Sequence, residues 1–321
     1  MSRPGRAALL AAPGSVELVP VPAAPLGAGQ VRVAVDGCGV CGSDGPVWEG
    51  RPWFDYPRPP GTPGHEAWGR VTEVGPDTVG LEIGTPVALL AENAFTDTLV
   101  VPAARLVSLP PALAGRPFPG EALGCAFNVA RRSGFAAGQT VAVVGVGFLG
   151  ALIVALAAEA GARVVAVARR ASALDVARQM GAAETVLMDD HQRVIAELSA
   201  LTGGQLCPRV VEATGAPWPL DLAGELTGVG GRLVIAGYHQ GGLRSVNVQL
   251  WNWRGIDVVN AHERDTEVVL AGIREAVAAV VSGRLDPRPL YTHSFPLEKL
   301  GAALDAAALR PDGFVKALVT R

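Results

Sequence analysis

The sequence predicts an α/β protein that combines a doubly wound parallel sheet with a second, mostly β domain. Three observations support this prediction. A strand–glycine–helix–strand pattern lies near the middle of the 321-residue chain, alternating strands and helices follow it, and short strands broken by Pro and Gly precede it. A chain of this length can build two domains with separate hydrophobic cores.

The central pattern opens with Val141–Val144, which we predict to be a buried parallel strand because it is continuously apolar. Gly145, Gly147 and Gly150 follow at the G-x-G-x-x-G spacing, and a helix and a second apolar strand complete the unit. The first glycine allows a tight turn, the second a close approach of a pyrophosphate, and the third close packing of the helix. The helix N-terminus offers free N–H groups to phosphate. This context predicts a dinucleotide-binding site.

A membrane-spanning helix is the alternative interpretation of the same stretch. No charged residue occurs from Val141 to Ala158, and about 18 apolar residues are enough to suggest a membrane span. The spaced glycines and the strand that follows favour the nucleotide-binding unit. We therefore expect no membrane segment.

Further strands are predicted at Val186–Met188, at Arg209–Ala213 and at Arg232–Ala236, the last after a turn at Gly230 and Gly231. With a helix near residues 173–180, this alternation indicates a doubly wound parallel sheet.

Before the sheet, Val31–Val35 and Gly69–Val74 alternate in hydrophobicity on either side of a rigid loop, Pro57–Pro63. Short strands and frequent turns are typical of a compact, mostly antiparallel barrel. Leu290–Arg321 returns to short strands around a helix at Leu297–Ala307, and we expect it to pack onto the first domain. The predicted segments are 1–122 (catalytic), 123–257 (nucleotide-binding) and 258–321 (return to the catalytic domain).

Composition argues against several classes of partner and compartment. Lys and Arg number 27 and Asp and Glu 30, for a net charge of −3, which gives no reason to expect nucleic acid or an anionic membrane as a partner. The four cysteines, at positions 38, 41, 125 and 207, suggest no disulfide framework. That pattern favours a reducing compartment, and the N-terminal apolar run is too short for a signal peptide. We expect a cytoplasmic protein.

Two short segments carry candidate metal ligands. GCGVCGSD at 37–44 contains Cys41, and GTPGHE at 61–66 contains His65 and Glu66. Glu121 lies just ahead of the nucleotide-binding domain. A thiolate and an imidazole suit zinc, and a catalytic zinc takes three protein ligands and keeps one position open. By spacing alone, a structural role for the Cys and the His stays open.

The chain resembles the medium-chain, zinc-dependent alcohol dehydrogenase superfamily over essentially its whole length. The matching segments are GVCGSD, GHE, GVGFLG, VVEATG at 210–215, GG at 230–231 and GFVKALV. GEALGCAFNVARRSG resembles the polyol, threonine and cyclitol dehydrogenase branch. The resemblance implies a GroES-like fold for the mostly β domain and a Rossmann fold for the other.

The resemblance also implies roles for individual residues. Cys41 and His65 correspond to the principal zinc ligands, and Glu66 to an acidic neighbour that binds the metal directly in some relatives. Glu121 corresponds to the third protein position, bound directly or through water. Ser43 corresponds to the hydroxyl that takes the proton of the substrate, although an ordinary turn serine is the alternative.

Two departures from the family pattern limit the prediction. The second proton-relay histidine of some relatives corresponds to Pro46, so that route is missing here. The four-cysteine structural zinc lobe is also missing, because residues 84–103 contain no cysteine. We therefore expect one catalytic zinc per chain and no structural zinc, and we expect Cys38 and Cys125 to serve in packing.

The cofactor is predicted to be NADP rather than NAD. Many members that use NAD place an acid after the second strand, but here Ala168 is followed by Arg169 and Arg170. Guanidinium groups bind a 2′-phosphate bidentately, although the two arginines could simply begin a solvated helix. Lys316 resembles a basic residue that reaches the pyrophosphate. The expected cofactor-binding residues are Gly145, Gly147, Phe148, Leu149, Gly150, Arg169, Arg170, Gly237 and Lys316.

The implied reaction is hydride transfer between a secondary alcohol of the polyol, sugar or cyclitol type and NAD(P), with Ser43 and Glu66 as catalytic residues. Polar side chains beyond the sheet suggest either a pocket for a hydroxylated substrate or a subunit interface of a homo-oligomer. The competing interpretations are a zinc-free quinone or enone reductase of the same superfamily and a non-catalytic NADPH-binding sensor. The expected substrate walls are Val40, Trp48, Glu49, Trp53, Tyr56 and Phe95, and the polar set is Trp251, Trp253, His239, Asn260, His262 and Glu263.

Overall fold

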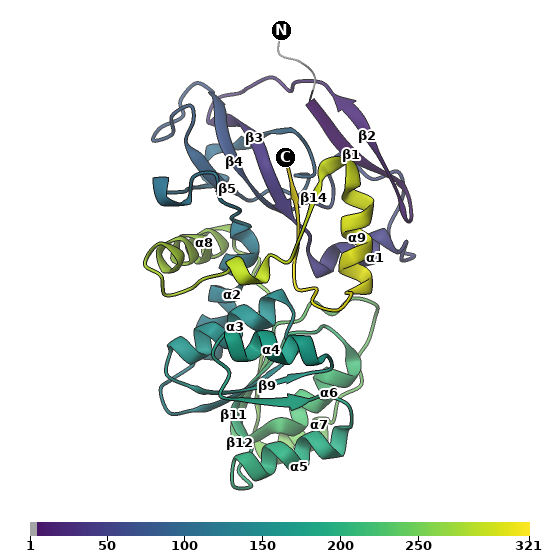
Figure 1. Ribbon diagram of the computed structural model, residues 1–321, viewed down its shortest axis with the longest axis vertical. Coiled ribbons are helices and arrows are strands. Elements are labelled where there is room, and N and C mark those ends of the chain that lie inside the picture. The colour runs from purple at the N-terminus through teal and green to yellow at the C-terminus, as the bar shows by residue number, and fades with distance from the viewer. Residues whose placement is uncertain (1–4) are drawn as a thin grey trace. The chain divides into compact units, whose positions relative to one another are not determined.

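The structure, a computed structural model, describes residues 5–321 (Figure 1). The chain divides into two compact units. The first contains residues up to Gly124 together with Asp265–Arg321, and the second is Cys125–Arg264. The first unit is therefore built from two separate stretches of the chain.

The described part of the second unit contains a six-stranded parallel sheet with strand order β10-β9-β8-β11-β12-β13. The order reverses between β8 and β11, and in such sheets ligands bind at the carboxyl ends of the strands on either side of the reversal. The prediction of a doubly wound parallel sheet is confirmed. The strands are β8 (Thr140–Val144), β9 (Arg163–Ala168), β10 (Glu184–Leu187), β11 (Cys207–Glu212), β12 (Thr227–Ile235) and β13 (Asp257–Asn260).

Helices cover both faces of this sheet, with α3 and α4 on one face and α5 and α6 on the other (Figure 1). Most of α3 is buried, which explains the uncharged stretch that resembled a membrane span. Among the helices of residues 5–321, none has both the length and the apolar character to cross a bilayer. The helices are α3 (Phe148–Glu159), α4 (Ala171–Gln179), α5 (His191–Leu201), α6 (Pro217–Leu226) and α7 (Val248–Arg254).

The predicted turn at Gly230 and Gly231 is wrong, because both glycines lie inside β12. Gly230 has φ of 63°, and the register of β12 against β11 shifts between Cys207 and Arg209. A β-carbon on Gly231 would stand 2.8 Å from the carbonyl oxygen of Gly228. The glycines therefore mark an irregular strand.

The first unit contains a seven-stranded sheet in which β14-β15-β3-β4-β5-β7 lie in order and β6 pairs with β3. All pairs are antiparallel except β14–β15, as expected for a mostly antiparallel barrel. Alternate residues of β3 point into the core, including Val31, Val33 and Val35. A separate two-stranded antiparallel sheet is formed by β1 (Gly5–Ala12) and β2 (Ser15–Val21). The seven strands of the larger sheet are β3 (Gln30–Gly39), β4 (Glu66–Val74), β5 (Pro86–Leu89), β6 (Thr98–Pro102), β7 (Leu106–Ser108), β14 (His293–Pro296) and β15 (Ala317–Thr320).

The C-terminal stretch completes the first unit. β15 pairs antiparallel with β3, so that Val319 stands opposite Cys38. α8 (Thr266–Val281) was not predicted, although Asp265 caps it by accepting a hydrogen bond from the backbone N–H of Glu267 at 2.9 Å. The remaining helices are α1 (Gly45–Trp48), α2 (Gly120–Ser133) and α9 (Leu300–Leu309), with 3₁₀ turns η1 (Gly42–Asp44), η2 (Ala103–Arg105), η3 (Pro111–Leu113), η4 (Arg288–Leu290) and η5 (Leu297–Lys299).

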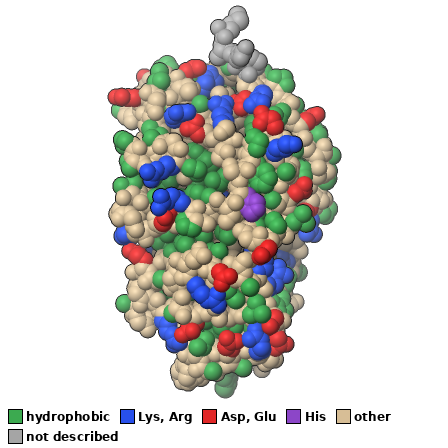
Figure 2. All heavy atoms as spheres, viewed as in Figure 1, with side chains coloured by type: hydrophobic (Ala, Val, Ile, Leu, Met, Phe, Trp, Pro, Cys, Tyr) green, Lys and Arg blue, Asp and Glu red, His purple; other side chains and the backbone are tan. Residues whose placement is uncertain are grey.

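The surface carries both signs of charge. On the face drawn in Figure 2, basic and acidic side chains are interspersed, in keeping with the net charge of −3.

Candidate active site

The register of two strands brings three predicted ligands together. β3 and β4 pair antiparallel with Gly39 opposite Glu66, so the residues just after β3 lie beside those just before β4. Cys41, His65 and Glu66 each place a ligand atom within 4.8 Å of those of the other two. Sulfur, nitrogen and carboxylate oxygen are the ligand types of catalytic zinc sites, so the cluster fits that metal.

Glu121 lies in the first turn of α2, outside this three-residue cluster. Burial raises the pKa of Glu121. The charge of His65 opposes that rise in pKa and the charge of Glu66 adds to it, so Glu121 is within electrostatic reach of the cluster. The structure thus brings three of the four predicted ligands together and leaves the fourth nearby.

Asp44 supports the cluster, and the sequence analysis missed it. Its side chain is 1% exposed, and Oδ2 accepts a hydrogen bond from the backbone N–H of Cys41 at 2.9 Å. Oδ1 has no hydrogen-bond partner and lies 3.6 Å from Nδ1 of His65. That nitrogen donates to the carbonyl oxygen of Pro63 at 2.8 Å. The carboxylate of Asp44 and the carbonyl of Pro63 both face Nδ1 of His65, which leaves Nε2 of that ring to bind a metal.

The pKa values of Asp44 and His65 reflect this arrangement. Burial raises the pKa of Asp44 to about 6, and the charge of His65 only partly offsets it. Burial lowers the pKa of His65, but the hydrogen bond to Cys41 and the charge of Asp44 outweigh it and raise that pKa to about 12. The metal-free site therefore favours a proton on the imidazole, which a metal must displace.

Lys316 and Glu66 form a buried ion pair that sequence spacing did not reveal. The side chains are 4% and 1% exposed, and Nζ of Lys316 lies 2.7 Å from Oε1 and 2.5 Å from Oε2 of Glu66. Burial lowers the pKa of Lys316, but the charges of Glu66, Cys41 and Asp44 and the hydrogen bond to Glu66 together outweigh burial and raise the pKa. The predicted role of Lys316 toward a pyrophosphate stays a prediction.

The other residues near Cys41 differ in exposure. Ser43 lies in η1 and is half-buried. Pro46 stands in the first turn of α1, where its missing N–H costs no hydrogen bond. Trp48 and Phe95, expected as substrate walls, are 7% and 1% exposed and belong to the hydrophobic core.

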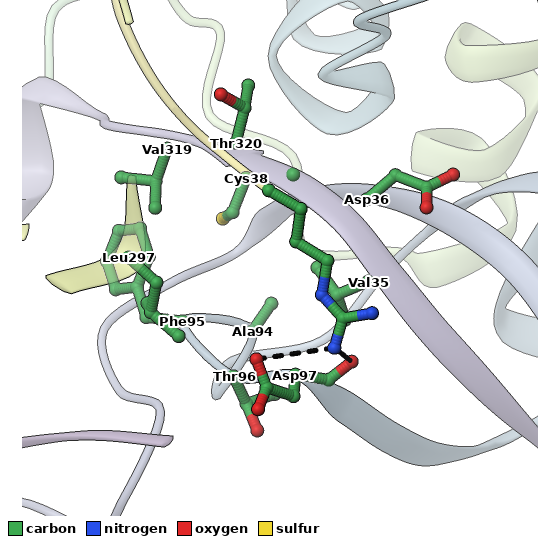
Figure 3. A pocket seen from close by; sticks show the side chains of 12 residues that line it. Val35, Asp36, Cys38, Ala94, Phe95, Thr96, Asp97, Leu297, Val319 and Thr320 are labelled. Atoms are coloured by element: carbon green, nitrogen blue, oxygen red, sulfur yellow. Dashed lines mark hydrogen bonds and ion pairs between the residues drawn. The ribbon is translucent and has the colours of Figure 1, made fainter. Parts of the chain in front are cut away.

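A small cavity lies in the same unit (Figure 3). Its volume is about 20 Å³, and Cys38 and Phe95 are among its lining residues. Arg321 donates a hydrogen bond at 3.0 Å to the carbonyl oxygen of Asp97 at its edge. A cavity of this size holds about one water molecule, so it is too small for a substrate. Cys38 is 1% exposed, which fits a packing role.

In the second unit, the three glycines of the central motif have different surroundings. A β-carbon on Gly150 would stand 1.9 Å from the carbonyl oxygen of Gly145, and Gly145 itself has φ of 98°. A β-carbon on Gly147 would meet nothing within 4 Å. Only Gly147 thus borders open space, as an approaching phosphate would require. Phe148 and Leu149 follow as the first residues of α3.

The remaining predicted cofactor residues of this unit follow two strands of the sheet. Arg169 and Arg170 come directly after β9, and Arg170 is the N-cap of α4. Gly237 comes just after β12, and a β-carbon there would stand 2.1 Å from the backbone nitrogen of Gly215. All three residues therefore lie at the carboxyl edge of the sheet, where dinucleotides bind.

A buried network at this edge was also missed. Glu212, fully buried at the end of β11, accepts hydrogen bonds from the backbone N–H groups of Thr214 at 2.6 Å and Gly215 at 2.9 Å. Its Oε2 lies 2.9 Å from Nε2 of His239, and Arg244 donates to Nδ1 of the same ring at 3.3 Å. The network orders the segment after β12. The glutamate of the VVEATG segment at 210–215, which is Glu212, is the sequence signal that could have revealed this network.

Two protein families match consecutive parts of the chain. Residues 27–111 match the alcohol dehydrogenase GroES-like domain, and residues 149–276 match the zinc-binding dehydrogenase domain. The chain belongs to the zinc-dependent medium-chain alcohol dehydrogenase superfamily. Both parts of the predicted fold class, Rossmann and GroES-like, are confirmed.

Curated relatives of this dehydrogenase span nearly its whole length. L-threonine 3-dehydrogenase of Bacillus licheniformis is 27% identical over 333 residues, covering 91% of this chain and 92% of that protein. Sorbitol dehydrogenase of Mus musculus is 28% identical over 343 residues, covering 92% and 90%. The dehydrogenase is an oxidoreductase that transfers a hydride between alcohols and NAD(P), as its resemblance to the family implied.

Solved structures share the fold of the dehydrogenase. 2R,3R-butanediol dehydrogenase from Bacillus subtilis is 25% identical, with a TM-score of 0.85 and 99% of each chain covered. A zinc-binding dehydrogenase from Sinorhizobium meliloti 1021, bound to NADP, is 24% identical, with a TM-score of 0.84 and 100% of each chain covered.

Proposed function

We propose that this dehydrogenase oxidises a secondary alcohol of the polyol, sugar or cyclitol type, with one catalytic zinc per chain and NADP as the preferred acceptor. The observation that carries the proposal is the cluster of Cys41, His65 and Glu66, with ligand atoms within 4.8 Å of one another. The names of the threonine and sorbitol dehydrogenases support a small hydroxylated substrate.

We assign the metal to Cys41 and His65, with Glu66 or Glu121 as the third ligand. Lys316 holds Glu66 in an ion pair, which favours Glu121 or a water at the third position until that pair opens. A zinc ion bound here polarises the hydroxyl of the substrate and lowers its pKa. Asp44 lies beside Nδ1 of His65, which would leave Nε2 of that ring to bind the metal.

Ser43 is proposed to accept the hydroxyl proton. It follows Cys41 by two residues, and its turn is fixed by the hydrogen bond from the backbone N–H of Cys41 to Asp44. Because Pro46 carries no titratable group, the proton leaves Ser43 through water or the cofactor ribose. A nicotinamide cofactor held by the glycine motif would supply the hydride acceptor, and oxidation of the carbinol carbon would then yield a ketone and the reduced cofactor.

The preference for NADP is proposed from Arg169 and Arg170. The end of β9 carries no acid that would repel a 2′-phosphate, and guanidinium groups bind phosphate bidentately. Gly147 supplies open space for the pyrophosphate. We further propose a cytoplasmic homo-oligomer, which the four cysteines, none of them in a disulfide, and the exposed side chains of Leu243 and Trp253 support.

The test combines metal analysis with a substrate panel. Zinc-loaded protein is assayed on polyols, sugars, cyclitols and simple alcohols with NAD and with NADP. About one zinc per chain and faster turnover of polyols with NADP are expected. Cys41→Ala is expected to lose the metal, whereas Ser43→Ala keeps the metal and loses turnover. A zinc-free protein that reduces quinones or enones would refute the proposal.

A further inference from the structure

Arg310 occupies a position that its residue type disfavours. It ends α9 with φ of 48° and ψ of 65°, and its backbone N–H donates to the carbonyl oxygen of Ala306 at 2.9 Å. This left-handed position after a helix is usually glycine, because a β-carbon is disfavoured there. Nε of Arg310 donates to the carbonyl oxygen of Ala307 at 3.4 Å, which caps the end of the helix. A non-glycine residue in the left-handed conformation still motivates a search for function.

The side chain of Arg310 reaches the loop of the candidate active site. Nη2 stands 3.7 Å from the place that a β-carbon on Gly42 would occupy. Gly42 lies between Cys41, a proposed metal ligand, and Ser43, the proposed proton acceptor. Consecutive α-carbons are about 3.8 Å apart. The guanidinium therefore lies next to Gly42, the residue between Cys41 and Ser43.

The helix that carries Arg310 is fixed to the same loop region. Nε1 of Trp48, at the end of α1, donates to Oδ1 of Asp305 on α9 at 2.8 Å. Near the start of α9, a β-carbon on Gly301 would stand 3.4 Å from the indole of Trp48. These contacts fix α9 against α1, which directly follows η1 in the chain, so the helix that carries Arg310 is packed beside this loop.

We propose that Arg310 forms an anion-binding subsite beside Ser43, which takes a carboxylate or phosphate group. The guanidinium is always charged, and its planar fork matches the oxygens of either group. Gly42 and Arg310 are both exposed, and the missing side chain of Gly42 leaves room for a ligand. The inference rests on the proposed function and narrows its substrate to a hydroxy acid or a phosphorylated polyol. The pyrophosphate of the cofactor offers the same chemistry from a second source.

The substitution Arg310→Gly tests whether the arginine serves ligand binding rather than protein stability. Glycine relieves the left-handed conformation, so the melting temperature is expected to stay the same or to rise. The KM for an anionic substrate is expected to rise about 10- to 100-fold, the range for losing a hydrogen bond to a charged group. The KM for its neutral counterpart, such as the unphosphorylated polyol, should not change. Arg310→Lys keeps the charge and should lose only part of the effect.

Direct binding keeps this test independent of turnover. Inorganic phosphate is titrated into zinc-loaded protein and followed by thermal shift, and NADPH is titrated by fluorescence. Wild type should be stabilised by phosphate more than Arg310→Gly, even if no alcohol in the panel is oxidised. The control, Arg116→Gly, replaces an exposed arginine between η3 and α2 and should bind phosphate like wild type.

The outcomes are distinct. Weaker binding of the anionic substrate with unchanged NADPH affinity supports the substrate as the source of the anion. Weaker NADPH binding without substrate discrimination supports the same subsite with the cofactor pyrophosphate as its ligand. Equal phosphate, NADPH and substrate binding in wild type and Arg310→Gly would overturn the proposal.

Discussion

Replacing Lys316 with methionine removes one partner of the buried pair while nearly keeping the volume of the side chain. Glu66 is 1% exposed, and both of its oxygens lie within 2.7 Å of Nζ. Removing one partner of such a pair leaves an uncompensated buried charge, which costs about 3–5 kcal/mol. At roughly 2–4 °C per kcal/mol for a unit of this size, the melting temperature should fall by about 6–20 °C.

The assay is thermal unfolding of Lys316→Met, of Glu66→Gln and of the double variant, all metal-free. The double variant should regain most of the lost stability, because a neutral amide and a thioether leave no charge unpaired. Zinc should stabilise Lys316→Met more than wild type if the freed carboxylate moves onto the metal. A melting temperature of Lys316→Met within 2 °C of wild type would refute the reasoning.

Three further predictions test other parts of the molecule. Gly150→Ala should lower stability by about 1–3 kcal/mol, because its β-carbon would overpack the turn. Gly147→Ala should cost at most about 1 kcal/mol of stability, as a weaker N-cap, yet it should raise the Kd for NADPH. If both variants had equal effects on thermal unfolding and on NADPH titration, the geometry would be contradicted. Asp44→Asn should weaken zinc binding about 10- to 100-fold in a chelator competition, and unchanged affinity would argue against support of the imidazole. Asp97→Asn should lower stability by up to about 1 kcal/mol at pH 7 in denaturant unfolding, because arginines depress the pKa of this carboxyl. The difference from wild type should begin to shrink below about pH 4 and vanish once the pH is below the lowered folded pKa. An equal loss of stability in the exposed control Asp55→Asn would disprove it.

The sign of the Asp97 prediction follows from linkage. Burial raises the pKa of this carboxyl, but hydrogen bonds from Arg6 and the charge of Arg321 outweigh it and lower the pKa in the folded state. A carboxyl with a lowered folded pKa adds stability above its unfolded pKa, near 3.9, and loses that stability as pH falls through the folded value.

The parts of the fold that the sequence predicted are those with local signals. The glycines of the central motif stand between a predicted strand and a predicted helix, and this context together with their spacing identified the nucleotide-binding unit. Cys41 and His65 were candidate ligands because thiolate and imidazole suit zinc, and their roles were assigned by the resemblance to the dehydrogenase family. The carboxylate of Glu66 adjoined one of them in sequence.

The missed features depend on contacts between distant segments. Lys316 meets Glu66 across 250 positions of the chain, and no spacing rule predicts such a pair. Asp44 resembled an ordinary turn acid until the fold placed it 3.6 Å from the imidazole of His65. Arg310 became notable only when its backbone angles and the neighbouring Gly42 were known.

The pairing of β15 with β3 has a consequence for biosynthesis. Val319 pairs with Cys38, so the Gly37–Gly39 end of β3, which already pairs with β4 on its other side, lacks its β15 partner until residue 319 has been synthesised. Until then the carboxylate of Glu66 has no ammonium to neutralise it. The nucleotide-binding unit, whose residues are contiguous, can fold earlier during translation. Stalled or truncated chains should therefore carry a finished nucleotide-binding unit beside an open barrel, which is a form suited to capture by chaperones.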